Sequence, residues 1–340
     1  MSRRLAQAEP DAGAVQDRTA RDRIAAARRA GALLAGAGLL AALAVRERCR
    51  ARRAEHAHPP LGRFIMVDGV RLHYLERGHG DPLVYFHGNG GTIREALASG
   101  LVDLAAERYR VIVFDRPGYG HSSRPAGRSW MPEAQAAFFR RALEALGVAR
   151  PILVGHSWGP FIALELALRD PAYVRGLVLL SGFYVPMPRL DMMLISLLAL
   201  PGLGTVLRHT LWPSIARALW APSLRPLFAP APVSPCFAAE FPRDMALRPS
   251  QFRASAAETA MMLPAALALR PRYRELRVPV IIMAGRGDRH VPPQRHSAWL
   301  HEQIPGSELR LVEGAGHMVH HTFPEQALAA IDRVARRAAA

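Results

Sequence analysis

The sequence predicts an α/β fold in which a mostly parallel sheet carries helices on both faces. Short apolar runs, typical of strands buried on both sides, alternate with stretches of helical periodicity. Small-residue turns directly follow several of these runs. Half of the 340 residues are hydrophobic and 21% are charged, which is the composition of a globular protein and excludes a wholly disordered chain or a multi-span membrane protein.

Residues 1–59 form a basic N-terminal extension. Residues 1–29 are polar and are expected to be flexible or weakly helical. Residues 30–45 are 16 residues without a charge, with Arg on both sides. A helix that crosses a bilayer comfortably needs about 20 apolar residues, so this run is short for a span.

Three interpretations of residues 30–45 remain open. The favoured one is a single membrane anchor, which predicts a membrane-associated protein in contact with lipid through this run. The second is a cleaved export signal, since Ala42-Leu43-Ala44 offers small residues for cleavage. The third is a hydrophobic helix docked on the body of a cytoplasmic protein. Arg on both sides gives no orientation.

Charge and cysteine content exclude other classes. The net charge is +16 and all the basic side chains are Arg, but the sequence shows no base-reading basic helix and no basic groove interleaved with aromatic residues. We therefore expect no nucleic-acid partner. The two cysteines, Cys49 and Cys236, cannot build a disulfide scaffold or a Cys-rich zinc site.

The elements of the body follow in order from residue 60. Residues 64–75 read as two strands around an Asp68-Gly69 turn, and a helix is expected over 132–146 and again from 159 to about 168. The remaining predicted strands are 83–86, 109–114, 152–154, 177–180, 280–283 and 309–312.

The sharpest motif is Gly155-His-Ser157-Trp-Gly159, between an apolar strand and an apolar helix. A serine at the tip of a tight strand-to-helix turn needs small neighbours two residues away on each side, and Gly155 and Gly159 supply them. The helix N-terminus behind the serine favours developing negative charge. The motif predicts a serine nucleophile.

Five segments together make the chain resemble the α/β-hydrolase superfamily. They are His87-Gly88, Asp115-Arg-Pro-Gly-Tyr-Gly-His-Ser122, the motif around Ser157, Gly285-Arg-Gly-Asp288 and Gly314-Ala-Gly-His317. The resemblance implies an α/β-hydrolase core over 60–183 and 275–340. It also implies a helical lid over 184–274, in addition to the N-terminal hydrophobic helix.

The resemblance implies a Ser157, Asp288 and His317 triad. A serine hydroxyl needs a base, and the base needs an orienting carboxylate. Asp288 follows the strand at 280–283, and His317 follows the strand at 309–312, in the chain order of this fold. Glu313 and Asp191 remain alternatives for the acid, as His320 and His321 do for the base.

The oxyanion hole is expected to use the backbone N–H of Trp158 and that of Asn89, with Gly90 as the alternative to Asn89. His87 is expected to fix its loop by hydrogen bonds, and His156 to form a wall of the site. His317 and His321 have helical spacing for a metal, but no carboxylate completes an H-E-x-x-H pattern. No metal and no cofactor is expected.

The predicted lid is rich in apolar residues, including Met192, Trp220, Phe237 and Met262. An apolar lid over the serine favours an apolar small-molecule acyl substrate. The sequence therefore predicts a serine hydrolase of the carboxylesterase type, acting through an acyl-enzyme. The alternatives are acyl transfer, perhydrolysis or carbon–carbon bond hydrolysis, and a non-catalytic ligand-binding protein. The sequence leaves the natural substrate and the oligomeric state open.

Overall fold

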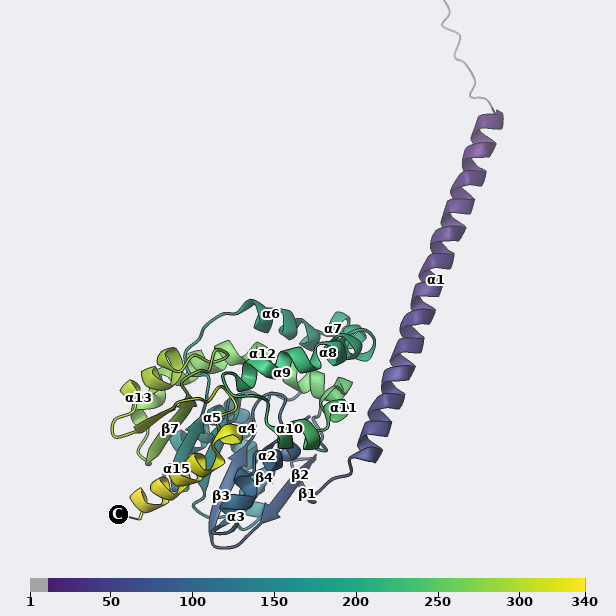
Figure 1. Ribbon diagram of the computed structural model, residues 1–340. Helices are drawn as coiled ribbons and strands as arrows, with labels where there is room; N and C mark the ends of the chain where they lie inside the picture. Colours follow the sequence, from purple (N-terminus) through teal and green to yellow (C-terminus); the bar gives the residue numbers. More distant parts are fainter. Residues whose placement is uncertain (1–11, 340) are drawn as a thin grey trace, which may run out of the picture. The chain divides into compact units, whose positions relative to one another are not determined.

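The computed structural model describes residues 12–339, which fall into two compact units that meet between Arg46 and Glu47. Helix α1 runs from Ala12 to Ala57 (Figure 1). The predicted polar extension is therefore helical from residue 12 onward, and its first 11 residues lie outside the described part. Abundant Ala and Arg explain the helix, because both residues have high helix propensity.

Part of α1 is long and apolar enough to cross a membrane. The stretch Arg23–Ala57 includes the uncharged run at 30–45 and contains an 18-residue window with a mean hydropathy of 1.5. Only 6% of that window is buried within the molecule, and Leu33 and Leu34 are exposed. Length and composition therefore fit either a membrane helix or a signal sequence. In the described residues, one further candidate exists, the bent helix pair Leu190–Ala199 and Leu203–His209.

One eight-stranded sheet forms the centre of the second unit, in the order β1-β2-β4-β3-β5-β6-β7-β8. Its strands are β1 Arg63–Val67, β2 Val70–Arg77, β3 Asp81–Phe86, β4 Tyr109–Phe114, β5 Ile152–His156, β6 Gly176–Leu180, β7 Val280–Gly285 and β8 Glu308–Val312. Only β1 with β2 and β2 with β4 pair antiparallel; the other five pairs are parallel. The mostly parallel sheet predicted from the sequence is confirmed.

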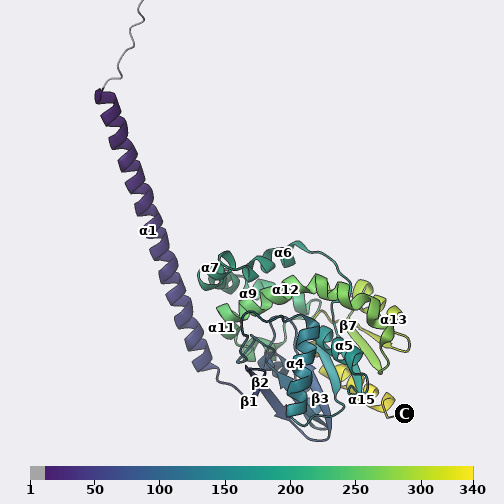
Figure 2. The same ribbon diagram turned by 180° about the vertical axis from the view of Figure 1, so that it is seen from behind.

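Helices cover both faces of the sheet (Figures 1 and 2). One face carries α2 Ile93–Ala98, α3 Leu101–Ala106 and α15 Pro324–Arg337; the other carries α4 Pro132–Ala145 and α5 Gly159–Arg169. The side chains of β3 alternate between the two cores, with Val84 and Phe86 on the α4 and α5 side and Leu83 and Tyr85 opposite. Helices α2 and α3 were not predicted from the sequence.

Between β6 and β7 the chain leaves the sheet and forms a helical insertion, which we define as α6 to η2. Its elements are α6 Leu190–Ser196, η1 Leu197–Ala199, α7 Leu203–His209, α8 Trp212–Ala218, α9 Trp220–Phe228, α10 Pro235–Glu240, α11 Arg243–Ala246, α12 Pro249–Leu269 and η2 Arg270–Glu275. After β7 come η3 Gln294–Ala298 and α13 Trp299–Gln303, and after β8 comes α14 Val319–Thr322. Helix α12 packs against α6, η1 and α7, so it forms the base of the insertion.

Candidate active site

Ser157 lies in the turn that joins β5 to α5. Its φ of 56° is in the left-handed region, which is strained for a residue with a side chain, and its N–H donates to the carbonyl of Leu180 at 2.9 Å. A Cβ on Gly155 would lie 2.5 Å from the nitrogen of Pro160, and one on Gly159 would lie 2.1 Å from the carbonyl oxygen of Phe86. The two glycines are therefore required by close backbone approach, as the sequence motif predicted.

His317 and Asp288 lie together at the carboxyl ends of β8 and β7. His317 Nδ1 is 2.8 Å from Asp288 Oδ2, and both side chains are buried. The other oxygen of Asp288 accepts the N–H groups of His290 and Val291, each at 2.8 Å. Burial alone would raise the pKa of Asp288, but His317, the N–H of Val291 and the electrostatic effect of His290 outweigh burial and lower the pKa. Asp288 is thus held as a carboxylate beside the imidazole.

The alternative acids and bases have other partners. Asp191 pairs with Arg189 at 2.6 Å, and Glu313 pairs with Arg286 on the surface. His320 and His321 both lie 2.8 Å from Glu95 Oε1. Among the sequence-based candidates, the structure therefore brings Asp288 and His317 into contact, and Ser157 lines the same cavity as His317.

A tight turn after β3 carries the predicted oxyanion donor. Gly91 N–H donates to the carbonyl of Gly88 at 3.1 Å, and Gly90 at the third position has φ 83°, as a type II turn requires. The amide of Asn89 is held by Ser255 O at 3.1 Å and Thr259 Oγ1 at 2.9 Å, both on α12. The Asn89 side chain therefore ties the turn at residues 88–91 to α12.

His87 and His156 have structural contacts. The backbone N–H of Arg116 donates to His87 Nε2 at 3.0 Å, so His87 Nδ1 carries the proton given to the carbonyl of Gly88 at 2.8 Å. His156 Nε2 lies 3.1 Å from the carbonyl of His317, and burial keeps the pKa of His156 well below its ordinary value. The two neutral imidazoles therefore tie the loops after β3 and β8 in place.

A buried ion pair joins this loop to the helical insertion. The Arg116 guanidinium donates to the carbonyls of His87 at 2.9 Å and Gly88 at 3.0 Å, and to Glu258 Oε2 on α12 at 2.9 Å. Arg116 and Glu258 are both 0% exposed. Tyr119 donates to the same carboxylate oxygen at 2.6 Å. The turn at residues 88–91 is thus clamped to α12 through one carboxylate.

Glu258→Ala is expected to lower the free energy of unfolding by about 3–5 kcal/mol, because it leaves the Arg116 charge buried without its partner. Denaturant unfolding of the full chain measures this. Glu144→Ala is the matched control, since Glu144 pairs with Arg140 on the exposed side of α4 and its loss is expected to cost under about 1 kcal/mol. Equal midpoints for the two variants would contradict the clamp.

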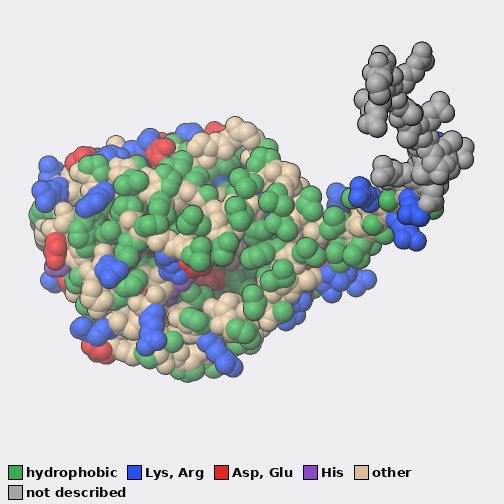
Figure 3. All heavy atoms as spheres, turned by 90° about the horizontal axis from the view of Figure 1, so that it is seen from above, with side chains coloured by type: hydrophobic (Ala, Val, Ile, Leu, Met, Phe, Trp, Pro, Cys, Tyr) green, Lys and Arg blue, Asp and Glu red, His purple; other side chains and the backbone are tan. Residues whose placement is uncertain are grey.

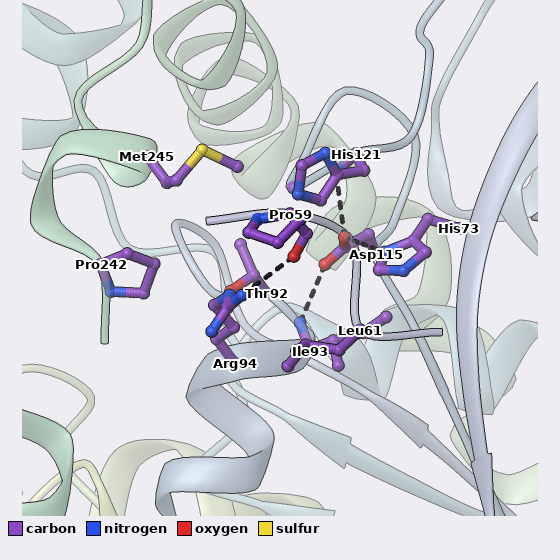
Figure 4. Close-up of a pocket in the computed structure, with 11 residues that line it drawn as sticks. Pro59, Leu61, His73, Thr92, Ile93, Arg94, Asp115, His121, Pro242 and Met245 are labelled. Atoms are coloured by element: carbon purple, nitrogen blue, oxygen red, sulfur yellow. Dashed lines mark hydrogen bonds and ion pairs between the residues drawn. The ribbon is translucent and has the colours of Figure 1, made fainter. Parts of the chain in front are cut away.

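Asp115 bonds to the start of α2, which follows the turn at residues 88–91, and to His73 and His121 (Figure 4). Its carboxylate accepts from Ile93 N–H at 2.8 Å and from His121 N–H at 2.9 Å, and lies 2.6 Å from His73 Nδ1. Burial alone would raise the pKa of Asp115, yet these contacts lower it to about 2. The bond to Ile93 fixes the start of α2 and hence the end of the turn that carries Asn89.

Glu95 gathers a second group of buried histidines beneath the site. Burial would raise the pKa of Glu95, but hydrogen bonds with His320 and His321 lower it well below its ordinary value. Glu95, His156 and His320 are the described residues close enough to hold a metal ion, with ligand atoms within 4.8 Å of one another. The pairing of His317 with His321 considered from the sequence does not form, because His317 precedes α14 and bonds to Asp288.

Three buried histidines make folding stability depend on pH. Burial lowers the pKa of His87, His296 and His320 to about 4 in each case. The unfolded chain binds these protons near pH 6.5, so the free energy of unfolding is expected to fall between about pH 6.5 and 4, by about 2 kcal/mol per histidine at pH 5. Denaturant midpoints at pH 7 and pH 5 measure this.

His296→Asn is the matched variant for that measurement. The Asn oxygen can accept the N–H groups of Tyr184 and Val185 that His296 Nδ1 accepts, but it does not titrate. The pH dependence should therefore become shallower. A midpoint that stays constant from pH 7 to 5 in the unaltered protein would refute this account.

Ser157 and His317 line a cavity of about 580 Å³. Asn89 and Gly90, in the turn at residues 88–91, border the cavity. Helices α6, α9, α10 and α12 of the insertion supply most of the remaining wall. Apolar lining residues from the insertion include Met192, Ile195, Trp220, Leu224, Phe237 and Met262. The cavity has the size and lining expected of a small-molecule site.

Sequence reasoning missed the residues that position the site. Arg116 lies inside a quoted motif, but its role depends on Glu258, 142 residues away. One signal was present: Glu258 interrupts the apolar stretch of α12 as an isolated charge. Glu95 gave no comparable signal, because its histidine partners lie 225 and 226 residues away.

Comparison with known proteins places the chain among hydrolases. Residues 81–324 match the family described as alpha/beta hydrolase fold. A 2-hydroxymuconate semialdehyde hydrolase of Pseudomonas putida is 29% identical over a region that covers 78% of this chain and 90% of the relative.

Two solved structures resemble this one. A bacterial membrane phospholipase A is 23% identical, with a TM-score of 0.62, and the match covers 94% of this chain and 99% of that chain. A thermophilic esterase from Thermogutta terrifontis is also 23% identical, with a TM-score of 0.66, over 82% of this chain and 99% of that chain. At this identity the likeness establishes a shared fold.

Proposed function

The chain belongs to the alpha/beta hydrolase family, and from that premise we propose that it is a serine hydrolase cleaving an ester or related acyl bond of an apolar small molecule. The observation that carries the proposal is the contact of His317 Nδ1 with Asp288, in a cavity that Ser157 also lines. Ser157 is the nucleophile, His317 the base and Asp288 the orienting acid.

The contact with Asp288 determines how His317 acts. Because Nδ1–H donates to the carboxylate, Nε2 carries the lone pair that removes the proton from Ser157 Oγ. Oγ then bonds to the carbonyl carbon of the substrate, and the carbonyl oxygen becomes an oxyanion. Asp288 stabilises the imidazolium that forms on His317. The lowered pKa of Asp288 keeps its carboxylate charged, which favours this stabilisation.

The oxyanion accepts hydrogen bonds from the backbone N–H groups of Trp158 and Asn89. Trp158 is the N-cap of α5, so its N–H lies at the positive end of a helix. When the tetrahedral intermediate collapses, the leaving alcohol takes the proton from His317 Nε2 and an acyl-enzyme remains. Water, deprotonated by His317, then releases the acid and regenerates Ser157.

The helical insertion acts as the lid in this proposal. We infer a core over 60–183 and 275–340 and a lid over 184–274, because the insertion supplies the apolar wall of the cavity. An apolar wall stabilises an acyl or alkyl group by removing it from water. The ion pair between Arg116 and Glu258 would hold the lid in a fixed position relative to the turn at residues 88–91.

Carbon–carbon bond hydrolysis is the second candidate, because the Pseudomonas putida relative is named for a substrate of that kind. The same serine, base and acid would act on an aldehyde or ketone carbonyl instead of an ester, and the carbon of the leaving fragment would take the proton from His317. Acyl transfer and perhydrolysis differ only in which nucleophile resolves the acyl-enzyme.

Active-site labelling with a fluorophosphonate tests the proposal. The probe is expected to modify Ser157 covalently, and prior incubation with an ester substrate should slow the labelling. A panel of p-nitrophenyl esters against 2-hydroxymuconate semialdehyde then separates the two candidates. A chain that is not labelled and hydrolyses neither substrate class would exclude a serine hydrolase.

We also propose that α1 tethers the protein to a membrane. The stretch Arg23–Ala57 is long enough, and contains a window apolar enough, to cross a membrane. Apolar insertion into a bilayer is not screened by salt. The full-length protein is expected to sediment with membranes and to remain there through a high-salt wash. Release of the intact chain by salt would contradict a tether, and a mature N-terminus near Val45 would identify a cleaved signal.

A further inference from the structure

The helical insertion exposes an unusual apolar surface. Leu190 is 72% exposed, Met193 63%, and Leu203 57%. The surface, which we call the apolar face, comprises Leu190, Met193, Leu194, Leu197, Leu200, Leu203, Val206, Leu211, Ile215 and Leu219. Figure 3 looks onto the insertion and shows hydrophobic side chains gathered there. Single exposed apolar residues are ordinary, but a contiguous set marks a surface that another phase or molecule covers.

The apolar face follows from the way the insertion packs. Helices α6 and α7, with η1 between them, rest on α12, and Met192 and Leu198 are buried. Ile195 lines the cavity, while Leu190, Met193, Leu194, Leu197, Leu203 and Val206 of the same elements are exposed. These short helices are thus apolar both on the side that packs on α12 and on the outer side, whereas an ordinary surface helix has a polar outer side.

Hydropathy and shape identify the covering phase. Leu190–Ala199 and Leu203–His209 together reach the hydropathy of a membrane span, yet the two helices are bent by 93°. A non-obligate protein interface is only about as apolar as the rest of the surface, whereas a face made of exposed Leu, Met, Val and Ile side chains is typical of contact with lipid. Two short helices at that angle suit the interface of a bilayer better than a straight crossing.

Charged and aromatic side chains agree with this assignment. Between residues 190 and 228 the sequence has one acid, Asp191. Of the three Arg in this stretch, Arg208 is buried and Arg217 pairs with Asp244, so Arg225 is the exposed cation. Asp191 itself pairs with Arg189. Trp212 and Trp220 are partly exposed in the same stretch, and Trp is enriched where a protein meets lipid headgroups. An apolar surface that bears Trp and few charges complements the acyl chains and the headgroup boundary of a bilayer.

The cavity opens among the same elements. Met192 and Ile195 on α6, and Trp220 and Leu224 on α9, line the cavity that holds Ser157. Figure 3 shows a hollow surrounded by hydrophobic side chains, with acidic and histidine side chains within it. The apolar lining is therefore continuous with the apolar face.

We propose that the apolar face of the insertion is a bilayer-binding surface, which inserts its Leu, Met, Val and Ile side chains among lipid headgroups and acyl chains and places the cavity mouth against the membrane. The binding depends on the exposed side chains of α6 to α9 and on no catalytic step. It adds a second membrane contact to the one proposed for α1.

Depth measurement on the full-length protein in vesicles tests this surface. Cys49 and Cys236 are both exposed and are first replaced by Ser. Single cysteines are then introduced by Leu197→Cys and Leu203→Cys, and by Glu144→Cys as the control on α4, whose carboxylate is 57% exposed. Each variant carries an environment-sensitive fluorophore in vesicles of phosphatidylcholine and phosphatidylglycerol, with and without brominated acyl chains.

Fluorophores at 197 and 203 are expected to shift to the blue and to be quenched at least about twofold by the brominated lipid, while the one at 144 is unchanged. Two positions keep the test valid if one variant misfolds. Fluorescence at 197 and 203 that matches the water-exposed signal at 144 would overturn the proposal. A blue shift without quenching would also overturn it, because a protein surface, such as a second copy of this chain, would then cover the face.

Discussion

Ser157→Ala is expected to abolish turnover, with kcat reduced by a factor of about 10³ or more. The substitution removes the hydroxyl that forms the acyl-enzyme and leaves the turn between β5 and α5 in place, since Gly155 and Gly159 still permit the close backbone approach. Initial rates with the best p-nitrophenyl ester measure the effect. The free energy of unfolding of the variant should stay within about 1 kcal/mol of that of the unaltered protein.

Ser223→Ala is the matched control for that experiment. Ser223 lines the same cavity, but its hydroxyl donates to the carbonyl of Trp220 and lies on the insertion. The control variant should retain most of its activity. If Ser157→Ala kept near-full turnover, or if the two variants lost activity equally, the nucleophile would be a different residue.

His317→Ala is expected to reduce kcat by a similar factor, because the variant has no base to take the proton from Ser157. Asp288→Asn should also lose activity, since an amide can stabilise the wrong tautomer of the imidazole and cannot stabilise the imidazolium. Partial recovery of the His317→Ala variant by added imidazole would show that the loss is of proton transfer and not of folding.

His320→Ala separates catalysis from structure. Its ring lies 2.8 Å from Glu95 and shares that carboxylate with His321. We therefore expect a lower free energy of unfolding, by about 1–3 kcal/mol, with kcat far less affected than in His317→Ala. A His320→Ala variant that is as inactive as His317→Ala but fully stable would transfer the role of base to His320.

The core strands and the turn at Ser157 could be predicted from the sequence. The predicted strands at 109–114, 152–154 and 280–283 correspond to β4, β5 and β7, because buried parallel strands are short continuous apolar runs. The helix predicted at 132–146 is α4. Helices α2 and α3 were missed, since six-residue helices are too short to display periodicity.

The predicted site residues could also be identified from short segments of the sequence. Ser157 directly follows β5, and Asp288 and His317 lie in the loops just after β7 and β8, so their positions at one edge of a parallel sheet could be expected from chain order. Their contacts could not. Asp288 and Glu313 are both carboxylates near the expected place, and only the structure shows that Asp288 lies against His317 while Glu313 faces Arg286.

By itself, the sequence determined the strands, the glycine-flanked serine turn and the order of the candidate catalytic residues, because each depends on side chains within a few positions of one another. Tertiary structure alone decided that Arg116 meets Glu258 across 142 residues, that Glu95 gathers His320 and His321, and that the apolar residues of α6 to α9 divide between cavity wall and exposed face. Those contacts join segments far apart in the chain, and their partners are selected by packing, to which local periodicity carries no information.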